Sequence, residues 1–229
     1  MKKLFLTAAI AVMTLATNQA QELKFGVKSG LNIANIGGDL GNFDFDETND
    51  FEARTSFHVG GLVEIPISEK FAIQPEVLYS SQGAKSTYRY DDGFDFENSE
   101  STIKLDYITL PIMAKFMPFE GFSIEAGPQV GFLVSAKSDN EFSYTDSGTG
   151  ETVSGSEDGV DVKDLYKSID FGLNFGVGYR LENGIMFQAR YNFGLADIDE
   201  EDDSDDFEEF DDFFEPKNRV FQLSVGYMF

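Results

Sequence analysis

The densest group of chemically capable side chains is an acidic stretch near the C-terminal end of the chain. Residues 197–215 hold 13 carboxylates in 19 positions. Hard cations such as calcium favour clustered carboxylate oxygens. The residues whose spacing imitates a calcium-binding loop are Asp197, Asp199, Glu201 and Glu208. Asp202 stands where the sharp turn of such a loop requires glycine, so the alternative is a solvated, self-repelling loop that binds no metal.

Catalytic chemistry has little support in this sequence. The chain contains no cysteine, which excludes disulfides, zinc-thiolate sites and thiol nucleophiles. The one histidine, His58, lies among strand residues that face inward, where a hydrogen-bonded interior group is commoner than a catalytic base. The nucleophile motif Gly-x-Ser-x-Gly does not occur. We therefore expect no enzymatic activity and no cofactor.

A second set of charged residues recurs on the polar faces of alternating segments. Its members are Lys28, Glu64, Glu76, Lys115, Glu125, Asp170, Arg180 and Arg190. Four are positive and four are negative, and isolated charges in the narrow interior of a small β-barrel would be costly. We expect these side chains to pair as a charge network that fills the interior. The alternative is a narrow ion-conducting path along the same charges.

Eight segments carry apolar residues at every second position, which predicts strands with one apolar and one polar face. They are residues 24–33, 56–65, 71–81, 105–116, 122–135, 169–181, 185–195 and 219–229. Short links follow the second, fourth and sixth strands, and Glu182-Asn-Gly184 is a tight hairpin signal. This alternation of short and long links is typical of outer-membrane barrels. The predicted fold is an all-β, eight-stranded antiparallel transmembrane up-and-down β-barrel with four long acidic loops.

The long loops account for the charge of the protein. Taken as residues 34–54, 83–104, 136–168 and 196–217, they hold 32 of the 41 acidic residues and 8 basic ones, which together give the net charge of −24. Such a rim repels nucleic acid and favours divalent cations or a cationic cell-surface protein as partners. Phenylalanines alternate with acids in residues 43–46, 94–97 and 210–215, which predicts strands that extend beyond the bilayer.

The first residues predict export from the cytoplasm. A cationic start, Met1 to Lys3, precedes the apolar stretch Leu4 to Leu15 and a small-residue cleavage region that ends near Ala20. This pattern predicts a signal peptide at residues 1–20 and a barrel domain at residues 21–229. An even number of strands places both termini on the periplasmic side of the outer membrane. The expected partners there are outer-membrane lipid and the barrel assembly machinery.

Three segments resemble the recurrent segments of a known family. Residues 75–85 (PEVLYSSQGAK), 106–116 (DYITLPIMAKF) and 127–137 (GPQVGFLVSAK) are similar to those of the PorT-like outer-membrane β-barrel family, also labelled "porin family". The resemblance covers nearly all of the mature chain and implies a small barrel in the outer membrane of a Gram-negative-type cell. One branch of that family is linked to protein secretion and gliding, and no residue set in this chain selects that branch.

The function expected from these features is structural or binding. The strands would anchor the protein, and the acidic loops would offer an interaction or cation-binding surface. Two alternatives remain open: a narrow channel or transport accessory, and an accessory component of a secretion system.

The last strand predicts how the chain enters the membrane. Apolar residues occupy every second position from Phe221 to Phe229, so Phe229 is expected at the periplasmic interface as an assembly signal. A Phe229→Asp variant should give less folded, heat-modifiable protein in the outer membrane, because a charge replaces an interfacial aromatic ring. An Ala196→Asp variant, which adds the same charge in a loop, is the control. Equal assembly of the two variants would contradict the assignment.

Overall fold

The computed structural model describes residues 23–37, 50–91, 95–146, 148–200 and 215–229. Its elements are β1 (Lys24–Gly37), β2 (Asp50–Pro66), β3 (Phe71–Asp91), β4 (Asp95–Phe116), β5 (Phe122–Asp146), β6 (Thr152–Asp161), the 3-10 turn η1 (Lys163–Leu165), β7 (Ile169–Arg180), β8 (Ile185–Gly194) and β9 (Lys217–Met228). Within these ranges, no helix is long and apolar enough to span a bilayer. The expected signal peptide, residues 1–20, lies outside the described residues.

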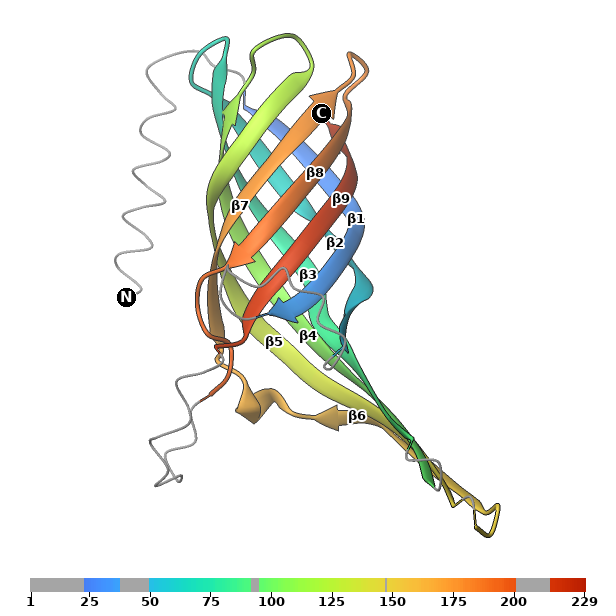
Figure 1. The fold of residues 1–229 in the computed structure, drawn as a ribbon. Helices are drawn as coiled ribbons and strands as arrows, with labels where there is room; N and C mark the ends of the chain where they lie inside the picture. Colours follow the sequence, from blue (N-terminus) through green and yellow to red (C-terminus); the bar gives the residue numbers. More distant parts are fainter. Residues whose placement is uncertain (1–22, 38–49, 92–94, 147, 201–214) are drawn as a thin grey trace.

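Eight of the strands form a closed ring (Figure 1). Each strand pairs antiparallel with its neighbours in the order β1, β2, β3, β4, β5, β7, β8 and β9, and β9 then pairs with β1. The closing pair runs from Gly26 opposite Met228 to Gly37 opposite Lys217. The predicted eight-stranded up-and-down barrel is therefore confirmed, with the last strand closing on the first.

The two faces of the barrel wall are inverted relative to a soluble protein. On β1, Phe25, Val27 and Leu31 are each more than half exposed, whereas Lys28 and Asn32, which alternate with them, are buried. The same alternation continues around the ring, with apolar side chains outside and polar ones inside. A lipid-facing exterior and a polar interior are the arrangement that a membrane-spanning barrel requires.

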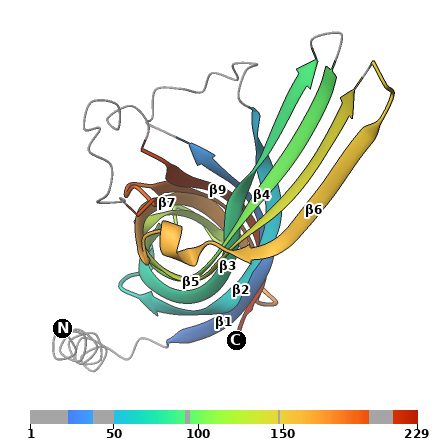
Figure 2. The same cartoon turned by 90° about the horizontal axis from the view of Figure 1, so that it is seen from below.

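One side of the ring continues far beyond the barrel. The ends of β3, β4 and β5 run on past the wall and, with β6, form a four-stranded sheet that leans away from the barrel (Figures 1 and 2). We call this sheet the arm; it comprises residues 86–91, 95–104, 137–146 and 152–161. The interpretation of residues 83–104 and 136–168 as loops was therefore wrong over most of their length. One side of these extensions is largely polar, and the other carries apolar residues such as Phe142 and Val153 among polar ones, so the strand pattern lacks the continuous apolar stripe that marks a membrane strand.

Three segments in which phenylalanine alternates with acids were expected to be strands that extend beyond the bilayer. One of the three lies in the arm. Asp95, Phe96 and Glu97 belong to β4, as expected of strands that extend beyond the bilayer. Residues 43–46 lie outside the described residues, and so do residues 210–214.

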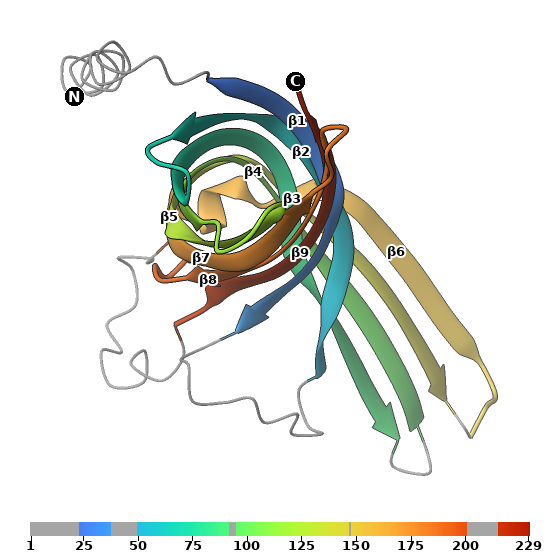
Figure 3. The same cartoon turned by 90° about the horizontal axis from the view of Figure 1, so that it is seen from above.

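An apolar cluster closes the barrel at the end from which the arm projects. Its buried members are Ile36, Ala84, Leu105, Tyr107, Leu133, Ala136 and Ile198. Val162 and Tyr166, on either side of η1, pack against this cluster, and η1 lies across the mouth when the barrel is viewed along its axis (Figure 3). We call these residues the mouth cluster. It separates the polar interior from the loops.

The opposite end has short turns, as predicted. Glu182 to Gly184 turns β7 into β8, and Gly184 has a φ of 90°, a conformation that glycine adopts without strain. Phe229 at this end donates its backbone N–H to the Phe25 carbonyl at 2.8 Å. The C-terminus and the three short links therefore share one end of the barrel (Figure 1).

Closure between β1 and β9 depends on a small residue at Gly30. A Cβ at this position would lie 1.9 Å from the Leu223 carbonyl oxygen, which belongs to the β9 backbone. We expect Gly30→Ala to destabilise the folded barrel by about 1–3 kcal/mol, because a backbone must shift to accommodate the methyl group. Urea unfolding in lipid vesicles measures this. Gly37→Ala on the same strand, whose nearest neighbour would be 3.9 Å away, should change little. Equal effects would contradict the argument.

Candidate functional site

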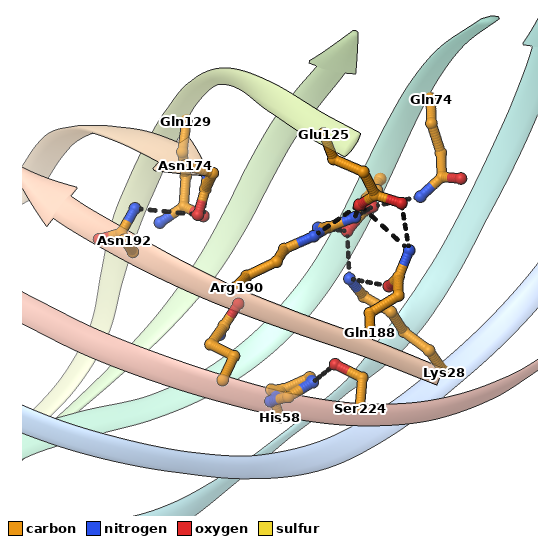
Figure 4. Close-up of polar contacts among 12 residues, drawn as sticks. Lys28, His58, Gln74, Glu125, Gln129, Asn174, Gln188, Arg190, Asn192 and Ser224 are labelled. Carbon is orange, nitrogen blue, oxygen red and sulfur yellow. Dashed lines mark hydrogen bonds and ion pairs between the residues drawn. The ribbon is translucent and has the colours of Figure 1, made fainter. Parts of the chain in front are cut away.

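Arg190 is the centre of the barrel interior. It extends from β8 across the lumen and contacts carboxylates on two other strands (Figure 4). Its Nη1 and Nη2 donate to the two carboxylate oxygens of Glu76 at 2.9 and 2.6 Å, which is the bidentate geometry that arginine favours. Its Nη2 and Nε also donate to Glu125 Oε2 at 2.7 and 3.1 Å. One guanidinium therefore joins β3, β5 and β8 across the lumen.

Two lysines extend this arrangement. Lys28 Nζ lies 2.7 Å from Glu76 Oε2, and its side chain is completely buried. Lys115 Nζ lies 2.9 Å from Glu64 Oε2 and 3.5 Å from Glu125 Oε1. Six of the eight residues expected in the network are thus linked by ion pairs with one another, and each of the six is more than nine-tenths buried.

Arg180 supplies the seventh member, at the short-turn end. Its Nη1 lies 2.7 Å from Glu64 Oε1, and about a quarter of its side chain is exposed. Beside it, a cavity of about 30 Å³ is bordered by Glu64, Lys115 and Ser123, which is room for little more than one water molecule. Arg180 is therefore the most exposed member of the network, at the aqueous end of the barrel.

The eighth expected member, Asp170, lies apart from the others. Arg190 is paired with Gly176 on β7, six residues along the strand from Asp170, or roughly 20 Å at the rise of a β-strand. Asp170 Oδ2 instead accepts a hydrogen bond from Asn218 Nδ2 at 2.9 Å, next to Tyr107 of the mouth cluster. Its inclusion in the network was wrong, because alternation predicts the face of a strand and not the height along it. The network thus holds four cations and three carboxylates.

Amide side chains complete the network, and these were missed from the sequence. Gln188 Nε2 donates to Glu125 Oε1 at 3.1 Å and its Oε1 accepts from Lys28 at 3.2 Å (Figure 4). Gln74 Nε2 donates to Glu76 Oε1 at 2.6 Å, and its Oε1 accepts from Lys115 at 2.9 Å. Both residues face inward on strands that also carry network charges. This position in the sequence could have predicted that they belong to the network.

Glycines make room for these large side chains. A Cβ at Gly176 would lie 2.6 Å from Arg190 Cγ. At Gly178 it would lie 2.8 Å from Glu125 Oε1. The glycine-rich segment of β7 therefore presents bare backbone to the arginine and glutamate that cross the lumen. Glycine in a strand interior commonly marks such close approach.

His58 belongs to a separate hydrogen-bonded group nearby. Its Nδ1 lies 2.8 Å from Asn32 Oδ1 and its Nε2 lies 2.8 Å from Ser224 Oγ. The three residue types match those of a hydrolase triad, but His58 and Asn32 are completely buried and Ser224 is nearly so. A catalytic serine needs space for substrate within hydrogen-bond reach. The arrangement instead satisfies every ring nitrogen of a buried histidine.

The calcium-loop candidates are only partly within the described residues. Asp197 Oδ2 lies 2.7 Å from Lys167 Nζ, and Asp199 pairs with Tyr166 as an isolated β-bridge. Burial and then the charge of Asp197 raise the pKa of the Asp199 carboxyl above its usual value. Glu201 and Glu208 lie outside the described residues. Within the described part of the chain, no three acidic, histidine or cysteine side chains come together as a metal-binding group.

Comparisons with known proteins agree with this architecture. A family model described as "Outer membrane protein beta-barrel domain" matches residues 19–200. A search of curated protein sequences found no match. Among solved structures, Ail, the attachment invasion locus protein of Yersinia pestis, is 10% identical with a TM-score of 0.41, and the match covers 91% of this chain and 99% of Ail. Neisserial surface protein A is 12% identical with a TM-score of 0.45, covering 91% and 100%.

OprG from Pseudomonas aeruginosa is similar at 11% identity and a TM-score of 0.38, covering 91% of this chain and 97% of OprG. At identities and TM-scores this low, the three solved structures assign no task to this chain.

The network predicts that its central cation is structurally essential. An Arg190→Met variant should lose about 3–5 kcal/mol of folding free energy, because Glu76 and Glu125 would remain buried without their shared partner. Urea unfolding in lipid vesicles measures this. The control is Lys104→Met, which removes the same charge from a part-exposed ion pair with Asp139 on the arm and should cost at most about 1 kcal/mol. Similar losses in the two variants would contradict a special role for the lumen network.

Proposed function

This chain belongs to the outer membrane protein beta-barrel domain family, and from that premise we propose that it is a closed barrel that anchors a binding surface outside the membrane. In this proposal the long-loop end faces the cell exterior and both termini face the periplasm, as in outer-membrane barrels generally. The barrel itself transports nothing. Its task lies in the arm and the acidic loops that it holds in place.

The single observation that carries this proposal is the ion-pair network across the lumen. Arg190 bridges Glu76 and Glu125, and Lys28 and Lys115 pair with the same carboxylates from other strands. An eight-stranded barrel has an interior only wide enough for side chains to fill. A hydrated ion would have to break several buried, charge-assisted hydrogen bonds to pass. The mouth cluster adds an apolar barrier at the outer end.

The binding surface of this proposal is acidic. Glu141, Glu157 and Asp158 are exposed on the arm, and the sequence beyond residue 200 continues with carboxylates. Such a surface favours divalent cations or a cationic cell-surface protein as its partner. Because the arm is β-sheet and not loop, it offers a fixed surface that needs little ordering on binding.

The PorT-like resemblance fits within this proposal without narrowing it. Its three segments, residues 75–85, 106–116 and 127–137, lie on β3, β4 and β5, which are neighbours in the barrel wall and continue into the arm. An accessory role in a secretion system would use the same outer surface. A narrow channel would require the lumen network to open.

Conductance measurements in planar bilayers test the proposal. Purified protein whose insertion is verified by heat-modifiable migration should give no steady conductance at neutral pH, because the network and the mouth cluster obstruct the lumen. A known porin inserted under the same conditions is the positive control. Reproducible single-channel steps from the inserted protein would refute the closed barrel and favour the channel alternative.

A further inference from the structure

The outermost strand of the arm has an unpaired edge. The sheet order ends at β6, which pairs with β5 on one side and with no other strand among the described residues (Figures 1 and 2). Its regular part, from Thr152 to Glu157, pairs with Thr145 to Asn140. An irregularity near Gly159 then shifts the register, and Val160 and Asp161 pair with Ser138 and Lys137. Six residues of open edge span roughly 20 Å, which is enough for another strand to pair.

An aromatic side chain marks the middle of this edge. Phe142 of β5 lies directly opposite Gly155 of β6, and a Cβ at Gly155 would lie 2.7 Å from the ring atom Cε1 of Phe142. The ring therefore lies over the glycine and reaches toward the open edge. It is 52% exposed, and Val153 on the same face of β6 is 61% exposed. A side chain on an added strand opposite Gly155 would contact this ring.

The charges beside the edge have one sign. Residues 151–161 contain Glu151, Glu157, Asp158 and Asp161 and no lysine or arginine. Glu157 shares a face with Phe142, because Asn140, its partner on β5, lies two residues from Phe142. Among the nearby lysines, Lys85 and Lys104 form ion pairs with Glu100 and Asp139, and Lys137 lies opposite Asp161, beyond the regular part of β6. An incoming strand beside Thr152 to Glu157 therefore meets an aromatic ring and the carboxylate of Glu157.

We propose that the β6 edge binds an extended, basic segment of a partner protein by strand addition. The segment pairs with Thr152 to Glu157. An arginine or lysine opposite Gly155 lies over the Phe142 ring, and a second one, two positions away, lies opposite Glu157. Strand addition takes its affinity from backbone hydrogen bonds and its specificity from alternate side chains, and a cation over an aromatic face adds to both.

A second copy of this chain is a poorer occupant than a basic segment. Pairing of two β6 edges would bring two sets of four carboxylates together without a cation between them. Acidic side chains on an edge are a common device against such self-pairing. This inference rests on the proposed function in one respect: the arm must lie outside the membrane, where a partner protein can reach it.

The test uses folded protein in lipid nanodiscs and a labelled peptide of about ten residues that alternates arginine with threonine. Binding is followed by fluorescence anisotropy. Phe142→Ala should weaken binding about two- to fivefold through loss of the cation–π contact. Glu157→Lys should weaken it about three- to tenfold, because a cross-strand attraction becomes a repulsion.

The matched control is Glu141→Lys. Glu141 lies next to Phe142 on β5 and points to the opposite face of the arm, so both lysine variants add the same charge to the same sheet. Its affinity for the peptide should stay within about twofold of wild type, since it lies one strand away from the edge. A glutamate–threonine peptide should not bind. Heat-modifiable migration verifies that each variant is folded.

Hydrogen exchange distinguishes strand addition from general charge attraction, because charge attraction alone would not protect backbone amides of β6. Backbone amides between Thr152 and Glu157 should become protected when the basic peptide binds, because strand addition gives open N–H groups a partner. Equal weakening by Glu157→Lys and Glu141→Lys, or binding without protection of β6, would overturn the proposal. Concentration-dependent self-association that protects the Thr152 to Glu157 amides without peptide would identify a second copy as the occupant instead. These outcomes do not depend on the conductance measurement, which tests the closed barrel separately.

Discussion

The structure depends on the constraint that a sheet in hydrocarbon must pair all of its backbone groups within the protein. The chain meets this constraint by closing eight strands into a ring, with β9 pairing with β1. Closure turns one face of every strand to lipid and the other into a narrow lumen. Apolar residues such as Phe25 and Leu31 therefore lie outside, and polar residues such as Lys28 and Asn32 lie inside.

The narrow lumen in turn explains the charge network. Side chains that face inward have no bulk water, so each charge needs partners from other strands. Arg190 meets this need by joining Glu76 and Glu125, and glycines at Gly176 and Gly178 leave the space it requires. Beyond the membrane the closure constraint no longer applies, because water pairs with open backbone groups. The arm can therefore end in an open edge at β6, where a partner can pair.

The sequence predicted the barrel well because alternation of apolar and polar residues is imposed by lipid on every membrane strand. It predicted the arm poorly because water imposes no continuous stripe: in residues 137–146 one face is polar throughout, and the other has only Phe142 and Tyr144 among polar side chains. The inward-facing charges were identified from their alternation with apolar residues along each strand. Ion pairs join seven of the eight. Asp170 was wrongly included in the network because alternation predicts the face on which a residue lies but not its position along the barrel axis. That position depends on strand register and tilt. The spacing of the acidic residues also did not predict that Asp197, a candidate calcium ligand, forms an ion pair with Lys167.

The central claim is that the lumen network seals the barrel, and thiol labelling tests it most directly because the natural chain has no cysteine. Single Ser123→Cys and Gln129→Cys variants place a thiol on β5 on the short-turn side and on the long-loop side of Glu125. A small, charged, membrane-impermeant thiol reagent is added to oriented vesicles from the short-turn side. The account predicts modification of Ser123→Cys and none of Gln129→Cys. Modification of both variants from that side would contradict a sealed lumen.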